Sequence, residues 1–278
     1  MSPRLRRSRG YRRTVADGGQ SKLGRARQHI TEAREIARAW LDSDVFIVEG
    51  TTDPATGRTE ARVRLRGSPP DQLALVVGDT VHNLRAALDQ AIFDAAYRHA
   101  GGSLTEAEER VLAFPILATA PQEGFEKRTA GQLPHVPVEV RRVVEEVQPY
   151  HWNDATYPDG SLFHTLWRVH DLDRIDKHRR LTVMAASLGH HGVGVPTGVE
   201  PDTKFFIASG PVRDGQVLVT YLGAESGVEY LFDLDVVLVE GRIPGQPAVD
   251  AMLDAFLHYV EWVVWRVNNR SAVSPRPS

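Results

Sequence analysis

The chain has 278 residues, of which 42% are hydrophobic and 25% are charged, as in an ordinary globular protein. It contains no cysteine, which excludes disulfides, thiolate metal sites and cysteine nucleophiles. The net charge is −3, and setting aside the six arginines of residues 1–13 leaves −9 on the rest, a sign that does not favour a general nucleic-acid binder. No stretch reaches the roughly 18 apolar residues of a membrane-spanning helix, so we expect a cytoplasmic protein without membrane contact.

The N-terminal segment is the most basic part of the sequence. Residues 1–20 show no apolar periodicity, and repulsion among the arginines opposes their ordering, so we predict a disordered tail. A weak, salt-sensitive contact between these arginines and a polyanion is the partner interaction that this segment suggests.

Hydrophobic periodicity near 3.6 residues predicts the helices. Shorter helices are predicted from about Leu104 and over residues 137–147. Four long helices are expected, and they cover residues 22–42, 71–99, 161–179 and 247–268.

Alternating apolar and polar residues predict the strands. A β-hairpin is expected over residues 44–66, because Asp53–Gly57 has the composition of a turn. Further strands lie within residues 181–239, and we expect them at 181–187, 193–199, 203–209, 216–222 and 228–239. The predicted fold class is α+β, a helical bundle packed with a mainly antiparallel sheet, in one domain over residues 21–270 followed by a disordered tail at 271–278.

The predicted helix 71–99 carries two different stripes. One stripe is apolar and forms the expected core contact, with Val77, Val81, Leu84, Leu88, Ile92 and Ala95. Beside it lie His82, Arg85 and Asp89, on a side that also carries Phe93. A polar stripe flanked by apolar residues is costly unless its charges are paired.

The predicted helix 161–179 shows the same feature. Its apolar face begins with Leu166 and Val169 and continues at helical spacing into Asp173 and Asp176. We therefore expect His82 or Arg85 to contact Asp173, Asp176 or His178 on the second helix. Lys177 lies in the same predicted cluster.

Two interpretations of this cluster remain open. It is either a buried ion-pair network that fixes helix register, or a site at which clustered histidine and carboxylate groups bind or react. The candidate functional residues are His82, Arg85, Asp89, Asp176, Lys177 and His178.

Four ordered motifs carry a resemblance to a known family. They are the segment 78–89 (GDTVHNLRAALD), Phe114-Pro115-Ile116, Gln148-Pro149-Tyr150 and Asp176-Lys177-His178-Arg179. Together they resemble the signature of a family of uncharacterised bacterial proteins. The resemblance implies no activity, but it implies that the two polar stripes belong to one site.

A looser similarity is to the HEPN helical-bundle ribonucleases, in which an arginine holds phosphate and a histidine on the same helix moves a proton. Arg174 and His178 do not reproduce the spacing of that motif. The leading hypothesis is a regulatory or binding protein rather than an enzyme. The alternative is a HEPN-like, metal-independent RNase or other phosphate-directed hydrolase, with His82 or His178 as base and Arg85 as phosphate clamp.

Other chemistries lack their motifs. His164, His170 and His178 share one predicted helix and His190-His191 is expected in a loop, but no HExxH pattern occurs. The sequence also has no Walker loop and no dinucleotide fingerprint. We therefore expect no metal and no organic cofactor, and a homodimer is compatible with the sequence.

Overall fold

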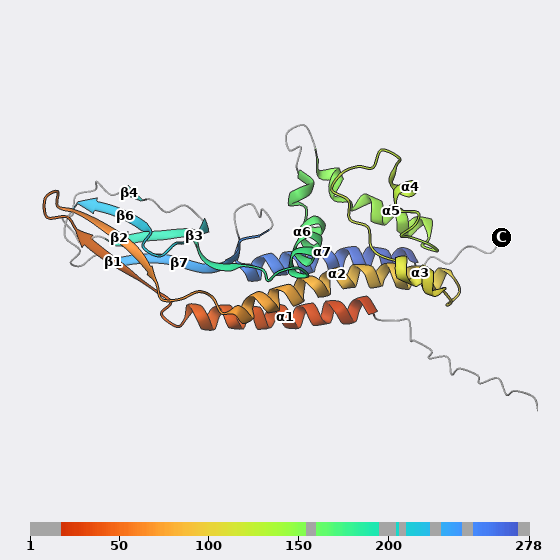
Figure 1. The fold of residues 1–278 in the computed structure, drawn as a ribbon, viewed down its shortest axis with the longest axis horizontal. Helices are drawn as coiled ribbons and strands as arrows, with labels where there is room; N and C mark the ends of the chain where they lie inside the picture. Colours follow the sequence, from red (N-terminus) through yellow and green to blue (C-terminus); the bar gives the residue numbers. More distant parts are fainter. Residues whose placement is uncertain are drawn as a thin grey trace, which may run out of the picture.

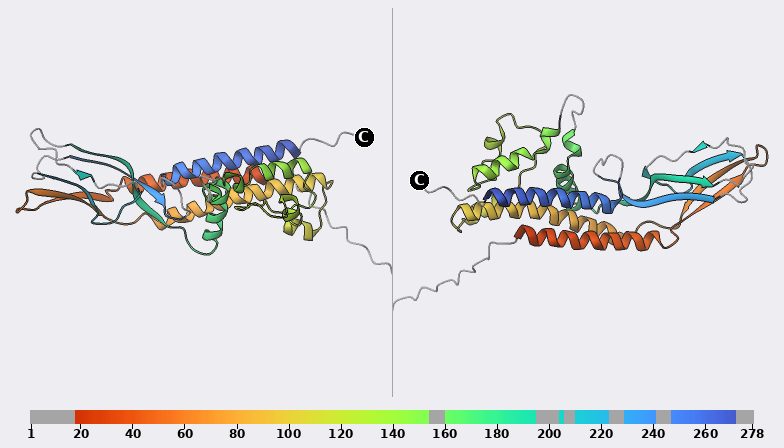
Figure 2. Two further views of the ribbon diagram at one scale, coloured as in Figure 1. Left: turned by 90° about the horizontal axis from the view of Figure 1, so that it is seen from above. Right: turned by 180° about the vertical axis from the view of Figure 1, so that it is seen from behind.

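The computed structural model describes residues 18–153, 160–194, 204–205, 210–222, 229–240 and 247–271. The fold is α+β, as predicted, with helices and strands at opposite ends of an elongated molecule (Figure 1). The three longest helices run side by side along the long axis in every view (Figure 2).

The helical end is built around one central helix. This helix, α2 (Asp71–His99), packs against α1 (Gly18–Leu41), α6 (Thr165–Asp176) and α7 (Val249–Ser271). Of the shorter helices, α4 (Phe125–Thr129) and α5 (Val138–Glu146) lie on one side of the bundle, and α3 (Glu106–Val111) lies at the end of α2 (Figure 1). Two 3-10 turns follow α5 in the chain, η1 (Pro149–Trp152) and η2 (Gly160–Phe163).

Apolar periodicity correctly identifies the faces that pack in the bundle. The predicted stripe on α2 is buried along its length, and Val81, Leu84 and Leu88 are each fully inaccessible. On α7, Val260 and Val264 are equally inaccessible. The same core extends to residues of β3 and β7 at the base of the strands, so the bundle and that part of the β end share apolar packing.

The strands form two antiparallel sheets. One has the order β1-β2-β6-β4, with β1 (Phe46–Thr52), β2 (Arg58–Leu65), β6 (Val217–Leu222) and β4 (Lys204–Phe205). The other has the order β5-β3-β7, with β5 (Gly210–Pro211), β3 (Val183–Gly194) and β7 (Glu229–Leu238). The predicted hairpin is present as β1 and β2, with Val48 opposite Val63.

The turn of this hairpin has a local cause. Asp53 accepts hydrogen bonds from the amide of Ala55 (2.9 Å) and the hydroxyl of Thr56 (2.7 Å). Gly57 has a φ of +64°, a backbone conformation that side chains disfavour. The hairpin is not a separate unit, because β2 pairs with β6 and so joins the four-stranded sheet.

Several predicted boundaries are wrong. Residues 18–20 belong to α1 rather than to a tail, since Gly19 is buried against Ala87 of α2. Ser271 likewise belongs to α7. Residues 1–17, 154–159, 195–203, 206–209, 223–228, 241–246 and 272–278 lie outside the described residues, so both tails, much of the 193–199 and 203–209 strands and the one-domain assignment stay predictions.

The predicted strand 181–187 continues without interruption. β3 runs on to Gly194 and pairs with β7 over Val183–Ser187 and again over His191–Gly194, with a register shift between Ser187 and His191. His190 and His191 therefore lie in a strand and not in a loop. The irregularity between Ser187 and His191 interrupts the pairing locally, and the same two strands pair again beyond it.

The helix predicted over 161–179 is shorter at both ends. The imidazole of His164 accepts a hydrogen bond at Nδ1 from the amide of Leu166 (3.2 Å) and so caps α6 at its N-terminus. Residues 160–163 form a 3-10 turn, and the α-helix ends at Asp176. Within the described residues, no helix has the length and apolarity needed to cross a membrane.

His164 couples this cap to α7. Its Nε2 lies 3.1 Å from the hydroxyl of Tyr259, and only 2% of the residue is exposed. Burial, with a smaller contribution from the charge of Arg168, lowers the pKa of His164 to about 4. The ring is therefore neutral in the folded protein at neutral pH.

This shift predicts acid sensitivity. Between pH 6.5 and 4 the unfolded chain binds a proton that folded His164 resists, so stability should fall by about 3 kcal/mol as the pH drops through this range. In urea unfolding at pH 7 and pH 4.5, His164→Gln should be less stable at pH 7 but lose less stability on acidification. The exposed control His178→Gln should keep the wild-type pH dependence, and an unchanged dependence in His164→Gln would contradict this assignment.

Candidate functional site

One buried carboxylate joins α2 to α6. Asp173 has a side chain that is 4% exposed, and its Oδ1 lies 3.0 Å from Nδ1 of His82. Its Oδ2 accepts from Nζ of Lys177 at 2.6 Å. The side chains of His82 and Lys177 are 53% and 56% exposed. The predicted contact between the two helices is thus present, and it presents two donors to solvent around one acceptor.

Arg85 points inward from the same stripe. Its side chain is 12% exposed, and Nη2 donates to the carbonyl oxygen of Phe114 (2.8 Å) and lies 3.0 Å from Oδ1 of Asp89. Asp89 Oδ1 also accepts from the amide of Phe114 at 2.8 Å. The two α2 side chains therefore hold both polar groups of one backbone residue, and we call this arrangement the Phe114 clamp.

The two charged side chains of the Phe114 clamp neutralise each other, but burying them costs free energy. Burial raises the pKa of Asp89, and the attraction of Arg85 and the Phe114 amide offsets only part of that effect. Nη1 of Arg85 is buried and has no hydrogen-bond partner among the described residues. Arg85 and Asp89 are therefore paired with each other, but this pairing offsets only part of the free energy that their removal from water costs.

A glutamine extends the clamp along the chain. Gln148 is fully buried, and its Nε2 donates to the carbonyl oxygens of Pro115 (2.9 Å) and Val144 (2.8 Å). Its Oε1 accepts from the amide of Leu117 at 2.9 Å. Sequence reasoning singled out the motif around Gln148 but missed its role. The available signal was a polar residue directly after the valine-rich face of α5.

Asp176 lies against the backbone of α2. A Cβ placed on Gly78 would overlap Asp176 Oδ1, so this carboxyl occupies the space that glycine leaves open. Burial, Asp79 and Asp173 all raise the pKa of Asp176, and His82 opposes them. Asp176 contributes close helix packing and negative potential beside His82.

Two residues toward the C-terminal end of α6, the predicted member His178 and Arg174, behave differently. His178 follows the end of α6 and is exposed, and the described residues offer its side chain no hydrogen bond or ion pair. Arg174, on the adjoining stripe, pairs with Asp171 (2.6 Å) instead of reaching α2. The structure therefore brings His82, Arg85, Asp89, Asp176 and Lys177 together and leaves His178 outside.

His170 links the cluster to its surroundings, although it was not a candidate. Burial, and next the charge of Arg85, lower the pKa of His170. Its ring contacts Trp167, with ring centroids 5.6 Å apart. Among the described residues, no group of three or more histidine, aspartate or glutamate side chains is arranged to hold a metal ion.

Comparison with known proteins found no matching family model, no matching curated protein and no matching solved structure. The resemblance to a bacterial family through its ordered motifs therefore stays a prediction.

The Phe114 clamp predicts the effect of Asp89→Ala. The substitution leaves the Phe114 amide unpaired and Arg85 without its carboxylate, at a cost of about 2–3 kcal/mol because Asp89 is only partly buried. Thermal unfolding should shift down by several degrees. Asp79→Ala removes the same charge from an exposed position of α2 and should melt like the wild type, whereas equal melting of both variants would show that the clamp does not stabilise the fold.

Proposed function

We propose that this chain is a binding or regulatory protein rather than an enzyme, and that it contacts an anionic, phosphate-bearing partner through His82 and Lys177. The observation that carries the proposal is the shared buried acceptor Asp173, which orients both exposed side chains. Lys177 retains two further N–H donors and His82 its second ring nitrogen, so both can bind a partner without losing Asp173.

The position of Arg85 supports binding over phosphate chemistry. A phosphate clamp must reach the substrate, but the guanidinium of Arg85 is directed into the protein and is engaged by Phe114 and Asp89. In this proposal, Arg85 stabilises the fold and does not contact the partner.

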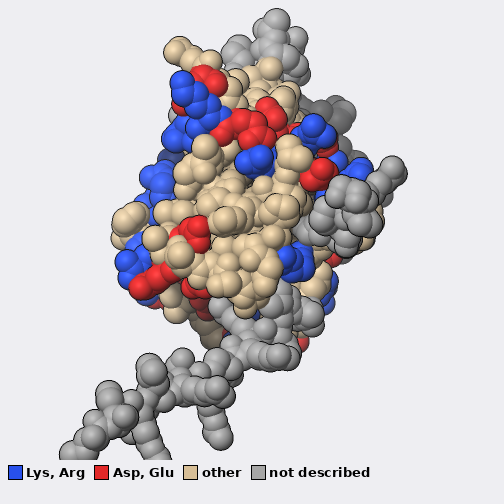
Figure 3. Space-filling view, turned by 90° about the vertical axis from the view of Figure 1, so that its right-hand side faces the viewer, with Lys and Arg blue, Asp and Glu red and all other residues tan. Residues whose placement is uncertain are grey.

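The charge distribution at the helical end of the molecule does not resemble a broad nucleic-acid surface. On the face seen from the helical end, Lys and Arg side chains are interspersed with Asp and Glu rather than gathered in one basic patch (Figure 3). Nucleic-acid binding surfaces concentrate positive charge on one face. A partner that offers one or two phosphate groups fits His82 and Lys177 better than a long polyanion does.

The second candidate is the HEPN-like RNase or other phosphate-directed hydrolase. One observation favours it, since a buried aspartate that accepts from a half-exposed histidine is the arrangement that orients a general base. His82 would then act as base, with Asp173 holding the ring and Lys177, in place of Arg85, contacting phosphate. His178 lies apart from this pair.

Two expectations from the sequence are kept within the proposal. We place the protein in the cytoplasm, as the sequence analysis expects. The N-terminal arginines could add a weak, salt-sensitive attraction for the same kind of anionic partner.

The two candidates differ in one experiment. At low salt, inorganic phosphate and a short RNA should perturb the NMR signals of His82 and its neighbours while the RNA stays intact. His82→Gln and Lys177→Gln should each weaken this binding by about tenfold.

Matched controls are His178→Gln and Lys22→Gln, which should bind as the wild type does. Loss of binding in the controls, or no binding at all, would contradict the proposal. RNA cleavage that disappears in His82→Gln would overturn it in favour of the hydrolase.

A further inference from the structure

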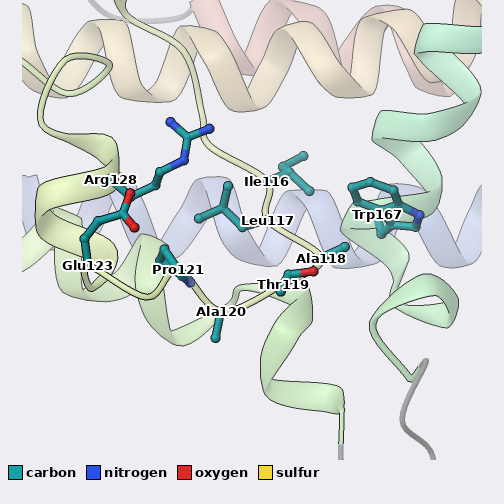
Figure 4. Close-up of a pocket in the computed structure, with 9 residues that line it drawn as sticks. All are labelled: Ile116, Leu117, Ala118, Thr119, Ala120, Pro121, Glu123, Arg128 and Trp167. Carbon is teal, nitrogen blue, oxygen red and sulfur yellow. The ribbon is translucent and has the colours of Figure 1, made fainter.

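A second site lies beside α6 and outside the ionic cluster. It is a pocket of about 420 Å³ whose floor is the extended segment 116–121. Trp167 of α6 stands at one end, and Glu123 and Arg128 approach from the other, with Ile116 and Leu117 between them (Figure 4). Its volume is within the usual range for small-molecule sites.

The two charges at one end have opposite signs. Arg128 lies on α4 and Glu123 just before that helix, and both are exposed. Among the described residues, neither side chain makes a hydrogen bond or ion pair. Within one pocket, Arg128 can therefore donate hydrogen bonds to the carboxylate of a ligand, and Glu123 can accept them from its ammonium group.

The other end is apolar and aromatic. The indole of Trp167 is half-buried and contacts the ring of His170. Ile116 and Leu117 are partly buried and pack against the main core. This end presents an aromatic ring and two aliphatic side chains to a ligand.

The floor of the pocket is fixed in advance. Gln148 binds the amide of Leu117, the amide of Tyr150 donates to the Leu117 carbonyl (3.3 Å), and Nδ2 of Asn153 donates to the Ala118 carbonyl (3.2 Å). Little ordering of this segment is needed when a ligand binds, which favours affinity.

We propose that this pocket binds a free α-amino acid with an aromatic or large apolar side chain. Its carboxylate meets Arg128, its ammonium meets Glu123, and its side chain packs on Trp167 and Leu117. The arrangement of two opposite charges at one end and an aromatic ring at the other fits a zwitterion better than a simple anion or amine. The site is independent of the phosphate contact proposed for His82 and Lys177.

Calorimetric titration with three related compounds tests the proposal. L-phenylalanine should bind, while 3-phenylpropanoate lacks the ammonium and 2-phenylethylamine lacks the carboxylate, so each should bind at least about tenfold more weakly. Equal affinity for L-phenylalanine and either analogue would overturn the zwitterion assignment. No heat from L-phenylalanine at concentrations up to about 10 mM would overturn the site itself.

Variants locate the binding. Arg128→Gln and Glu123→Gln should each weaken L-phenylalanine at least about tenfold without a change in melting temperature, because both side chains are exposed. The control Arg142→Gln, an exposed arginine of α5 away from the pocket, should bind as the wild type does. Lys177→Gln should also leave this binding intact, so failure of either proposal is distinguishable from failure of the other. Full affinity in Arg128→Gln would contradict the proposal.

Discussion

The backbone of Phe114 is held at both its polar groups by two charged side chains of α2, and the helical end depends on this interaction. Arg85 donates to its carbonyl and Asp89 accepts from its amide. From there the chain continues into the segment that Gln148 fixes and that forms the pocket floor. Charged groups at an apolar face are expensive to bury, and here they are matched to a backbone residue that would otherwise lack partners.

The ionic cluster divides into an inner and an outer part along α2. The inner part, Arg85 with Asp89, is directed into the fold. The outer part surrounds Asp173, whose carboxylate is buried while its two partners, His82 and Lys177, are about half exposed. Successive turns of one helix therefore carry an inward-directed arginine and a half-exposed histidine, because side chains three residues apart share a stripe but differ in depth.

Much of the helical end could be predicted because periodicity reports burial directly. The polar stripe beside the apolar stripe of α2 predicts that His82 or Arg85 contacts Asp173, Asp176 or His178, and the His82–Asp173 contact confirms it. The role of Gln148 could not be predicted, since a side chain that binds the backbone of Pro115 and Leu117 has no periodic pattern. The start of α6 was misplaced because the cap formed by His164 depends on Tyr259, which is distant in sequence. The unbroken β3 depends on its pairing with β7 and not on local composition.

Hydrogen–deuterium exchange of the segment around Phe114 tests the central claim most directly, namely that α2 holds this backbone through Asp89 and Arg85. The amides of Phe114 and Leu117 should be strongly protected in the wild type. In Asp89→Ala the protection at Phe114 should drop while α1 and α7 stay protected, since the Phe114 amide loses its acceptor and only the clamp is weakened. Unchanged protection at Phe114 in that variant would contradict the account, because the segment would then be held by something other than the charged stripe of α2.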